Sequence, residues 1–280
     1  MTAPKVLPLD GQIKNKFTGD VVSAKSFGLP FLGLLFTALL GGCVTTGLPE
    51  RQEVNLDKAL ETHVQLGLRY LQSGDNRELA RRHFNKALEL GRKNPLAHHG
   101  LALLYQADGE LKVAESHFKK ALRYGDNFSM ARTNFGVFLY KQERYKEALE
   151  QFRHASKDLT YNRRFFALVN YGRTASRLGM LEEAEQAYTR ALALNANLPV
   201  AQLELAELKF EAGDYAVAKQ YLDKYSENNR QTPRSLWLGI RIEKVFGNRD
   251  KELSYALALK NLYPYSAETL KYQELSGNDG

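Results

Sequence analysis

Apolar and polar residues follow a helical spacing from about Leu60 to about residue 275, and few prolines fall inside the apolar-periodic segments. The pattern also repeats along the chain. One copy contains, in order, Leu101, Ala102, Tyr105, Gly109, Ala114, Phe118 and Ala121. The next contains Phe135, Gly136, Leu139, Tyr145, Ala148, Phe152 and Ala155. A repeat of about 34 residues is the length of one pair of helices, so the sequence predicts an array of helix pairs.

The residue types in each copy suit close packing of two helices. Small residues such as Gly67 and Ala80 let the helices of a pair approach, and aromatic residues such as Phe84 fill the space between neighbouring pairs. Glycines such as Gly109 stand at the turns, where a left-handed backbone favours glycine. These features are typical of the tetratricopeptide repeat (TPR). We expect an all-α fold, a right-handed TPR superhelix of about six helix pairs over residues 57–275, with a degenerate last copy as its cap.

A separate apolar run precedes the repeats. It extends from Phe27 to Gly42, follows Lys25 and ends at a cysteine. The run is shorter than the roughly 20 residues of a membrane-spanning helix but suits the core of a signal peptide. Its last residues are Leu40, Gly41, Gly42 and Cys43, the pattern of a lipobox, at which bacterial lipoproteins are cleaved and lipidated. We therefore expect removal of residues 1–42 as a signal peptide and an N-acyl diacylglycerol on Cys43. The alternatives are an uncut signal anchor and a lone buried cysteine.

The residues after Cys43 predict where the chain is held. Val44 stands where an aspartate would resemble the inner-membrane retention signal, so we expect the lipoprotein sorting machinery to bring the chain to the periplasmic face of the outer membrane. Residues 43–56 lack a helical apolar pattern and are predicted to be a lipid-anchored tether. Residues 276–280 are predicted to be a disordered tail.

The first residues do not fit a lipoprotein signal. Residues 1–20 are an unusually long polar lead-in, which suggests that the true start lies after them. Because the next methionine is Met130, a shorter start needs a non-ATG codon, for which Val21 and Val22 are candidates.

Charge and cysteine content exclude two classes of interaction. The chain carries a net charge of +7, but lysines and arginines are interleaved with glutamates along the predicted helices rather than gathered in a tract. We therefore expect no nucleic-acid partner. With its single cysteine, Cys43, consumed by lipid, the chain forms no internal disulfide.

No catalytic or metal-binding constellation is evident in the sequence. His98 and His99 are adjacent, so on a helix they point about 100° apart, unlike the i, i+4 pairs that share a metal. The other histidines, His63, His83, His117 and His154, fall in separate predicted helices. Two carboxylate pairs, Glu182 with Glu183 and Glu204 with Glu207, are expected to be solvated or salt-bridged. We predict no catalytic residue, no metal and no cofactor apart from the lipid, in a protein that is not an enzyme.

The concave side of a TPR array, lined by the first helix of each pair, usually binds peptide segments of partners. Counting from the repeat positions predicts that its inward residues include Val64, Leu68, Leu71, Leu103, Asn134, Val137, Tyr140, Asn170 and Arg173. The early part of this surface is apolar and suits an apolar segment. The middle part is polar and could hold backbone amides or a carboxylate.

Several stretches resemble one family, the PilF/PilW lipoproteins of type IV pilus biogenesis. They are GCVTTG at residues 42–47, QLGLRYLQ at 65–72, NFGVFLYKQERYKEA at 134–148, RSLWLGIRIEKVF at 234–246 and LKNLYPYS at 259–266. The last two are the most specific, because general TPR proteins do not carry them. The long polar start departs from the family pattern.

The resemblance implies six TPRs on a lipid anchor and a role as pilotin for the outer-membrane secretin PilQ. It implies that the groove binds secretin subunits and that the acyl chains carry the pair to the outer membrane, where multimers form. We expect the apolar early groove to supply most of the affinity. The alternative is a TPR lipoprotein scaffold for cell-envelope enzymes that act on peptidoglycan, against which the stretch 234–266 argues.

Overall fold

The computed structural model describes residues 55–74 and 76–277. This part of the chain is built of helices without strands, which confirms the predicted all-α class. The helices are α1 (Leu56–Ser73), α2 (Arg77–Leu90), α3 (Pro95–Ala107), α4 (Leu111–Tyr124), α5 (Ser129–Lys141), α6 (Tyr145–Lys157), α7 (Arg164–Arg177), α8 (Leu181–Leu194), α9 (Pro199–Glu211), α10 (Tyr215–Asn228), α11 (Pro233–Val245), α12 (Arg249–Leu262) and α13 (Ala267–Gly277).

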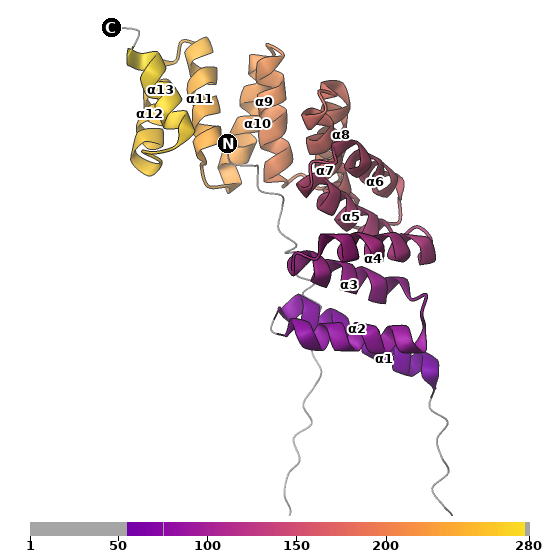
Figure 1. Cartoon of the computed structure of the whole chain (residues 1–280). Coiled ribbons are helices and arrows are strands. Elements are labelled where there is room, and N and C mark those ends of the chain that lie inside the picture. The colour runs from indigo at the N-terminus through magenta and orange to yellow at the C-terminus, as the bar shows by residue number, and fades with distance from the viewer. Residues whose placement is uncertain (1–54, 75, 278–280) are drawn as a thin grey trace, which may run out of the picture.

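Consecutive helices pack as pairs, α1 with α2 through α11 with α12, and each pair contacts the next. Figure 1 shows the pairs stacked in chain order along a curved array, from α1 and α2 at the indigo end to α12 and α13 at the yellow end. Among the described helices, the main contacts beyond each pair are with neighbouring pairs, as expected for a superhelix of repeats.

Local sequence sets the ends of several helices. The side-chain oxygen of Asn55 accepts a hydrogen bond of 3.0 Å from the backbone N–H of Lys58 at the start of α1. Thr232 and Ser235 form a reciprocal capping box at the start of α11. At the turn between α9 and α10, Gly213 has a φ of +81°, a left-handed conformation that glycine adopts without steric cost.

The core of most pairs places an aromatic ring against a small residue, whereas the fifth pair has Leu222 at the aromatic position. Phe84, Phe118, Phe152 and Tyr188 are at most 1% exposed. A Cβ added at Gly136 would lie 2.6 Å from the Phe152 ring, so the two helices approach too closely for a side chain there. The close approach predicted at the small positions is therefore confirmed. The rings pack against small residues of their own pair, and Phe84 also reaches Gly100 of the next pair, as predicted for the aromatic positions.

Three details differ from the expectation. The sixth pair is regular, and the cap is instead an additional helix, α13, which packs on α11 and α12. Ser276 and Gly277, predicted to begin a disordered tail, are the last residues of α13, and Leu56, predicted to end the tether, begins α1. The turn after α5 has no glycine, and Glu143 there adopts the left-handed region with a φ of 61°.

The predicted signal peptide of residues 1–42, the lipobox with Cys43, and most of the predicted tether lie outside the described residues, as do 278–280 of the predicted tail. Among the helices that are described, none has the length and apolar character needed to span a membrane.

Candidate functional site

The first helices of the pairs line the inner side of the curve. α1 packs against α3, α5 against α7 and α9 against α11, so the first helices of these neighbouring pairs meet. In helical repeat proteins the concave side is an extended surface for binding partners. We call the inner face formed by α1, α3, α5, α7, α9 and α11 the groove.

One repeated position shows how the groove changes along the array. It follows the small residue of each first helix and is occupied, from the first pair to the sixth, by Leu68, Leu103, Val137, Arg173, Glu207 and Ile240. The position is apolar in the first three pairs and charged in the fourth and fifth. A partner that lies along the groove therefore meets apolar side chains first and ionic groups afterwards.

The apolar residues predicted for the groove divide between core and surface. Val64 is 2% exposed and belongs to the core of the first pairs, so its side chain contributes to packing. Leu68 and Leu71 are half-buried against that core. Leu103 and Val137 are half-buried against a phenylalanine-rich core between the second and third pairs. These four half-buried side chains form the apolar part of the groove.

The two predicted asparagines are engaged by neighbouring groups. The Asn134 amide donates to Nε2 of His99 at 2.9 Å, and the Asn170 amide donates to the carbonyl oxygen of Phe166 at 3.0 Å. His99 is 2% exposed, and its burial lowers its pKa to about 4, so the neutral ring accepts this bond. One amide donor of each asparagine is thus used within the protein.

Arg173 and Tyr140 lie together in the middle of the groove. The guanidinium carbon of Arg173 is 5.9 Å from the centre of the Tyr140 ring, a cation–π arrangement. The Tyr140 ring in turn meets the edge of the Tyr145 ring at 5.1 Å between centres. Arg173 is 6% exposed, so its aliphatic part is covered and its head lies deep in the wall of the groove.

Ion pairs dominate the groove beyond α7. Arg234 on α11 donates to Glu204 on α9 at 2.9 and 3.0 Å and also to Glu207. Burial raises the pKa of Glu207, against the effect of the neighbouring guanidinium. Arg241 on α11 lies 4.1 Å from the centre of the Phe210 ring and pairs with Glu211 at 2.8 Å. The prediction that Glu204 and Glu207 are salt-bridged is confirmed.

Two histidine pairs were missed by the sequence reasoning, which left these histidines in separate helices. The Nδ1 atoms of His63 and His83 are 3.0 Å apart, and those of His98 and His117 are 3.1 Å apart. Both pairs occupy the same places in the first two repeats, so their recurrence at the repeat period is the signal that could have found them. Within the described residues, no three histidine, cysteine or acidic side chains are grouped to hold a metal.

The tautomers of the second pair follow from its surroundings. His98 Nε2 lies 3.1 Å from the carbonyl oxygen of Arg92, which can only accept, so Nε2 carries the proton. His98 Nδ1 therefore accepts from His117 Nδ1. Burial lowers the pKa of both imidazoles, that of His117 to about 4. The pair is a neutral packing contact at neutral pH.

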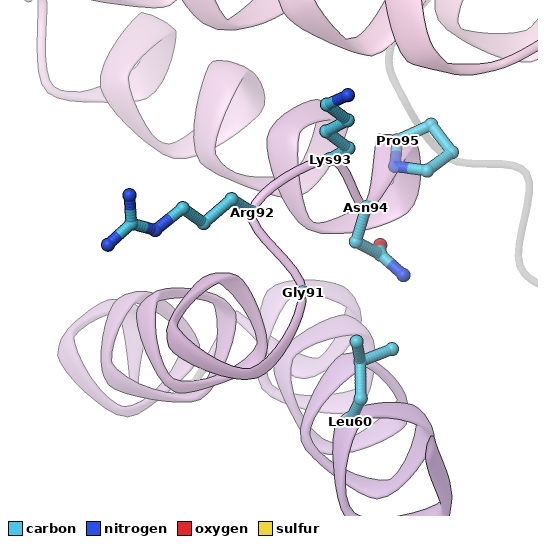
Figure 2. Close-up of a pocket in the computed structure, with 6 residues that line it drawn as sticks. All are labelled: Leu60, Gly91, Arg92, Lys93, Asn94 and Pro95. Atoms are coloured by element: carbon cyan, nitrogen blue, oxygen red, sulfur yellow. The ribbon is translucent and has the colours of Figure 1, made fainter. Parts of the chain in front are cut away.

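A hollow beside the loop between α2 and α3 has no catalytic chemistry. Figure 2 shows its lining, which consists of Leu60, Gly91, Arg92, Lys93, Asn94 and Pro95. These residues include no carboxylate, imidazole or hydroxyl side chain, so the hollow lacks the usual groups of acid–base and nucleophilic catalysis. The groove, an extended surface of the kind that binds partners in repeat proteins, is the candidate site, and binding is its candidate activity.

Comparison with known proteins agrees with this architecture. TPR family models match residues 64–127, 99–158 and 176–236. The type IV pilus assembly protein PilF of Pseudomonas aeruginosa is 38% identical over 244 residues, which are 86% of this chain and 96% of PilF. The chain belongs to the PilF/PilW family of type IV pilus TPR proteins.

Solved structures of the PilF/PilW family share the fold. The structure of P. aeruginosa PilF has a TM-score of 0.72 at 38% identity, and the match covers 78% of this chain and 98% of PilF. The structure of PilW, described as a widely conserved type IV pilus biogenesis factor, has a TM-score of 0.63 at 30% identity and covers 77% of this chain and 98% of PilW. The family likeness thus extends over nearly all of both relatives.

Proposed function

We propose that this chain acts in type IV pilus biogenesis as an outer-membrane pilotin. Its groove binds subunits of the secretin PilQ, and its lipid anchor brings them to the outer membrane, where they form multimers. The family membership supports the pilus role. The lipobox that ends at Cys43 supports the anchor, with an N-acyl diacylglycerol on that cysteine, delivery by the lipoprotein sorting machinery and exposure to the periplasm.

The observation that carries the proposal is the row of half-buried apolar side chains on the first helices. Leu68, Leu71, Leu103 and Val137 offer apolar surface on one continuous face of three neighbouring pairs. Such a surface suits an extended or amphipathic segment of a partner. Attachment to the same membrane as the secretin raises the effective concentration of both proteins without any new contact.

The binding step is tested with the double variant Leu68→Glu, Leu103→Glu. Two charges on the apolar surface oppose burial of the partner, so we expect the affinity for purified secretin subunits to fall by at least about tenfold. The matched control is Leu111→Glu with Leu181→Glu, because these leucines are 44% and 53% exposed at the starts of the second helices α4 and α8. Equal affinity of the groove variant and the control, with both proteins folded, contradicts the proposal.

The anchoring step is tested by following secretin multimers on a non-boiled gel after membrane fractionation. In cells without this protein we expect the outer-membrane multimers to be lost, and with Cys43→Ser we expect them to be absent or misplaced. Unchanged multimers in both strains would favour the alternative function, a lipoprotein scaffold for peptidoglycan enzymes.

A further inference from the structure

Arg173 is a buried cation that pairs with no acidic side chain among the described residues. Among the described residues it is the one lysine or arginine in the buried class, at 6% exposed. The two buried carboxylates, in contrast, each have a cationic partner: Glu243 pairs with Lys219, and Glu252 pairs with Arg249 at 3.0 Å. A buried charge is costly when it is left unpaired, so the environment of Arg173 calls for an explanation.

The carboxylates on the next first helix are already engaged. Glu204 and Glu207 on α9 both accept hydrogen bonds from Arg234. Around Arg173 the structure instead offers the face of the Tyr140 ring at 5.9 Å, which stabilises a cation less than a carboxylate does. The guanidinium therefore keeps hydrogen-bond donors that no carboxylate of the described residues occupies.

The position of Arg173 also indicates what reaches it. Half-buried apolar residues precede it along the groove on α1, α3 and α5, and Phe210 continues the surface on α9. A segment that follows the groove passes Arg173 rather than ending there. The group that meets it is therefore a side chain within the segment and not a chain terminus.

We propose that Arg173, held against Tyr140, is a subsite for the carboxylate of an aspartate or glutamate within an extended partner segment bound in the groove. This inference rests on the proposed function, of which it names the chemistry of the partner segment. The planar guanidinium suits a carboxylate because two parallel N–H groups can donate to its two oxygens. The apolar part of the groove supplies burial, and Arg173 fixes the register of the segment.

The test uses the full chain, purified from membranes in detergent, and a displayed library of random linear peptides. We expect enriched peptides to combine apolar residues with an acidic residue at a fixed spacing. Replacing that residue by its amide should weaken binding to the wild-type chain by roughly 10- to 100-fold, measured by fluorescence anisotropy. On Arg173→Gln the same peptide change should have no further effect, because the two partners are coupled.

Two further variants separate binding from folding. Arg190→Gln changes an exposed arginine on the second helix α8, away from Tyr140, and should bind as the wild type does. Arg173→Lys keeps the positive charge but not the two parallel N–H donors of the guanidinium. We expect its peptide affinity to lie between those of the wild type and Arg173→Gln and still to fall as salt is added. If Arg173→Gln does not fold, the lysine variant and the peptide change on wild type still decide the question.

Three results would overturn the inference. They are enrichment of peptides without an acidic residue, an equal loss from the peptide change on wild type and Arg173→Gln, and binding that depends on the peptide's terminal carboxylate instead of its side chain. Binding of purified secretin subunits is measured in parallel. A chain that binds acidic peptides through Arg173 but does not bind the secretin refutes the proposed function alone.

Discussion

His99 illustrates how one residue couples packing to pH. Its ring packs edge-on against Phe128 at 5.3 Å between centres, and its Nε2 accepts from Asn134. Because Nε2 accepts, the proton of the neutral ring is on Nδ1, which is buried without a hydrogen-bond partner. A second proton would have to bind Nε2 and would break the bond from Asn134. Burial lowers its pKa from 6.5 to about 4. The folded state therefore binds protons less readily than the unfolded state does.

The resulting prediction is acid destabilisation. The contribution of neutral His99 is fully present above pH 6.5 and is lost as the pH falls from 6.5 to about 4. At about 1.4 kcal/mol for each pKa unit, the free energy of unfolding should fall by up to about 3 kcal/mol from this residue. Urea unfolding of wild type and His99→Phe across this range checks it, since the variant should have a flatter pH dependence. The control His154→Gln changes an exposed histidine and should keep the pH dependence of the wild type. Equal pH dependence of the unfolding free energy in all three proteins would contradict the role given to His99.

Neighbouring helices are joined by ion pairs as well as by apolar packing. Arg234 on α11 reaches Glu204 and Glu207 on α9, so its side chain links the first helices of the fifth and sixth pairs. The two glutamates are partly buried, with side chains 18% and 27% exposed. Removing only the Arg234 guanidinium leaves two partly buried carboxylates close together and unpaired. This lowers the stability of the fold more than removing the arginine and both carboxylates would.

We therefore expect Arg234→Met to lower the free energy of unfolding by about 1 to 3 kcal/mol. Adding Glu207→Gln should recover part of this loss, because the remaining repulsion is relieved. Arg82→Met is the control, since the Arg82 pair with Glu78 lies within one helix and is exposed. Urea denaturation of the four proteins measures the differences. A loss from Arg234→Met no larger than that of the control would show that the link contributes little.

The described part of the molecule is a one-dimensional array, because the main contacts of each helix pair are with neighbouring pairs. Stability should then be distributed along the array rather than shared by one core. Phe84 near one end is fully buried between Gly67 and Gly100. Trp237, the only tryptophan, lies on α11 at the other end and packs against a cluster that includes Leu259.

The prediction compares two probes of unfolding. Phe84→Ala removes about 3 to 5 kcal/mol of packing in the first pairs, so the transition followed by circular dichroism should broaden and begin earlier. The transition followed by Trp237 fluorescence should move less. Leu259→Ala should give the reverse pattern, with the larger shift in fluorescence. Identical shifts of both probes in each variant would show that the array unfolds as one cooperative unit.

Much of the fold was predictable because its rules are local. The approach of Gly136 to Phe152 recurs in each repeat as a small residue facing a large one, and such a pattern appears directly in the residue order. The capping helix α13 was not predicted because it follows the last repeat and resembles no segment of the other repeats, so the repeat pattern gives no signal for it. The left-handed turn at Glu143 was missed because a glutamate carries no signal for that conformation.

The sequence by itself determined the helices and their pairing, since both follow from a short repeating pattern. Only the tertiary structure decided which inward residues are accessible. Val64 belongs to the core, Leu68 is half-buried, and Arg173 is buried without a counter-charge among the described residues. It also decided that His63 meets His83 and that Arg234 reaches α9. These outcomes depend on how closely neighbouring helices pack and how the array curves, and both arise from the sum of many contacts rather than from any local pattern.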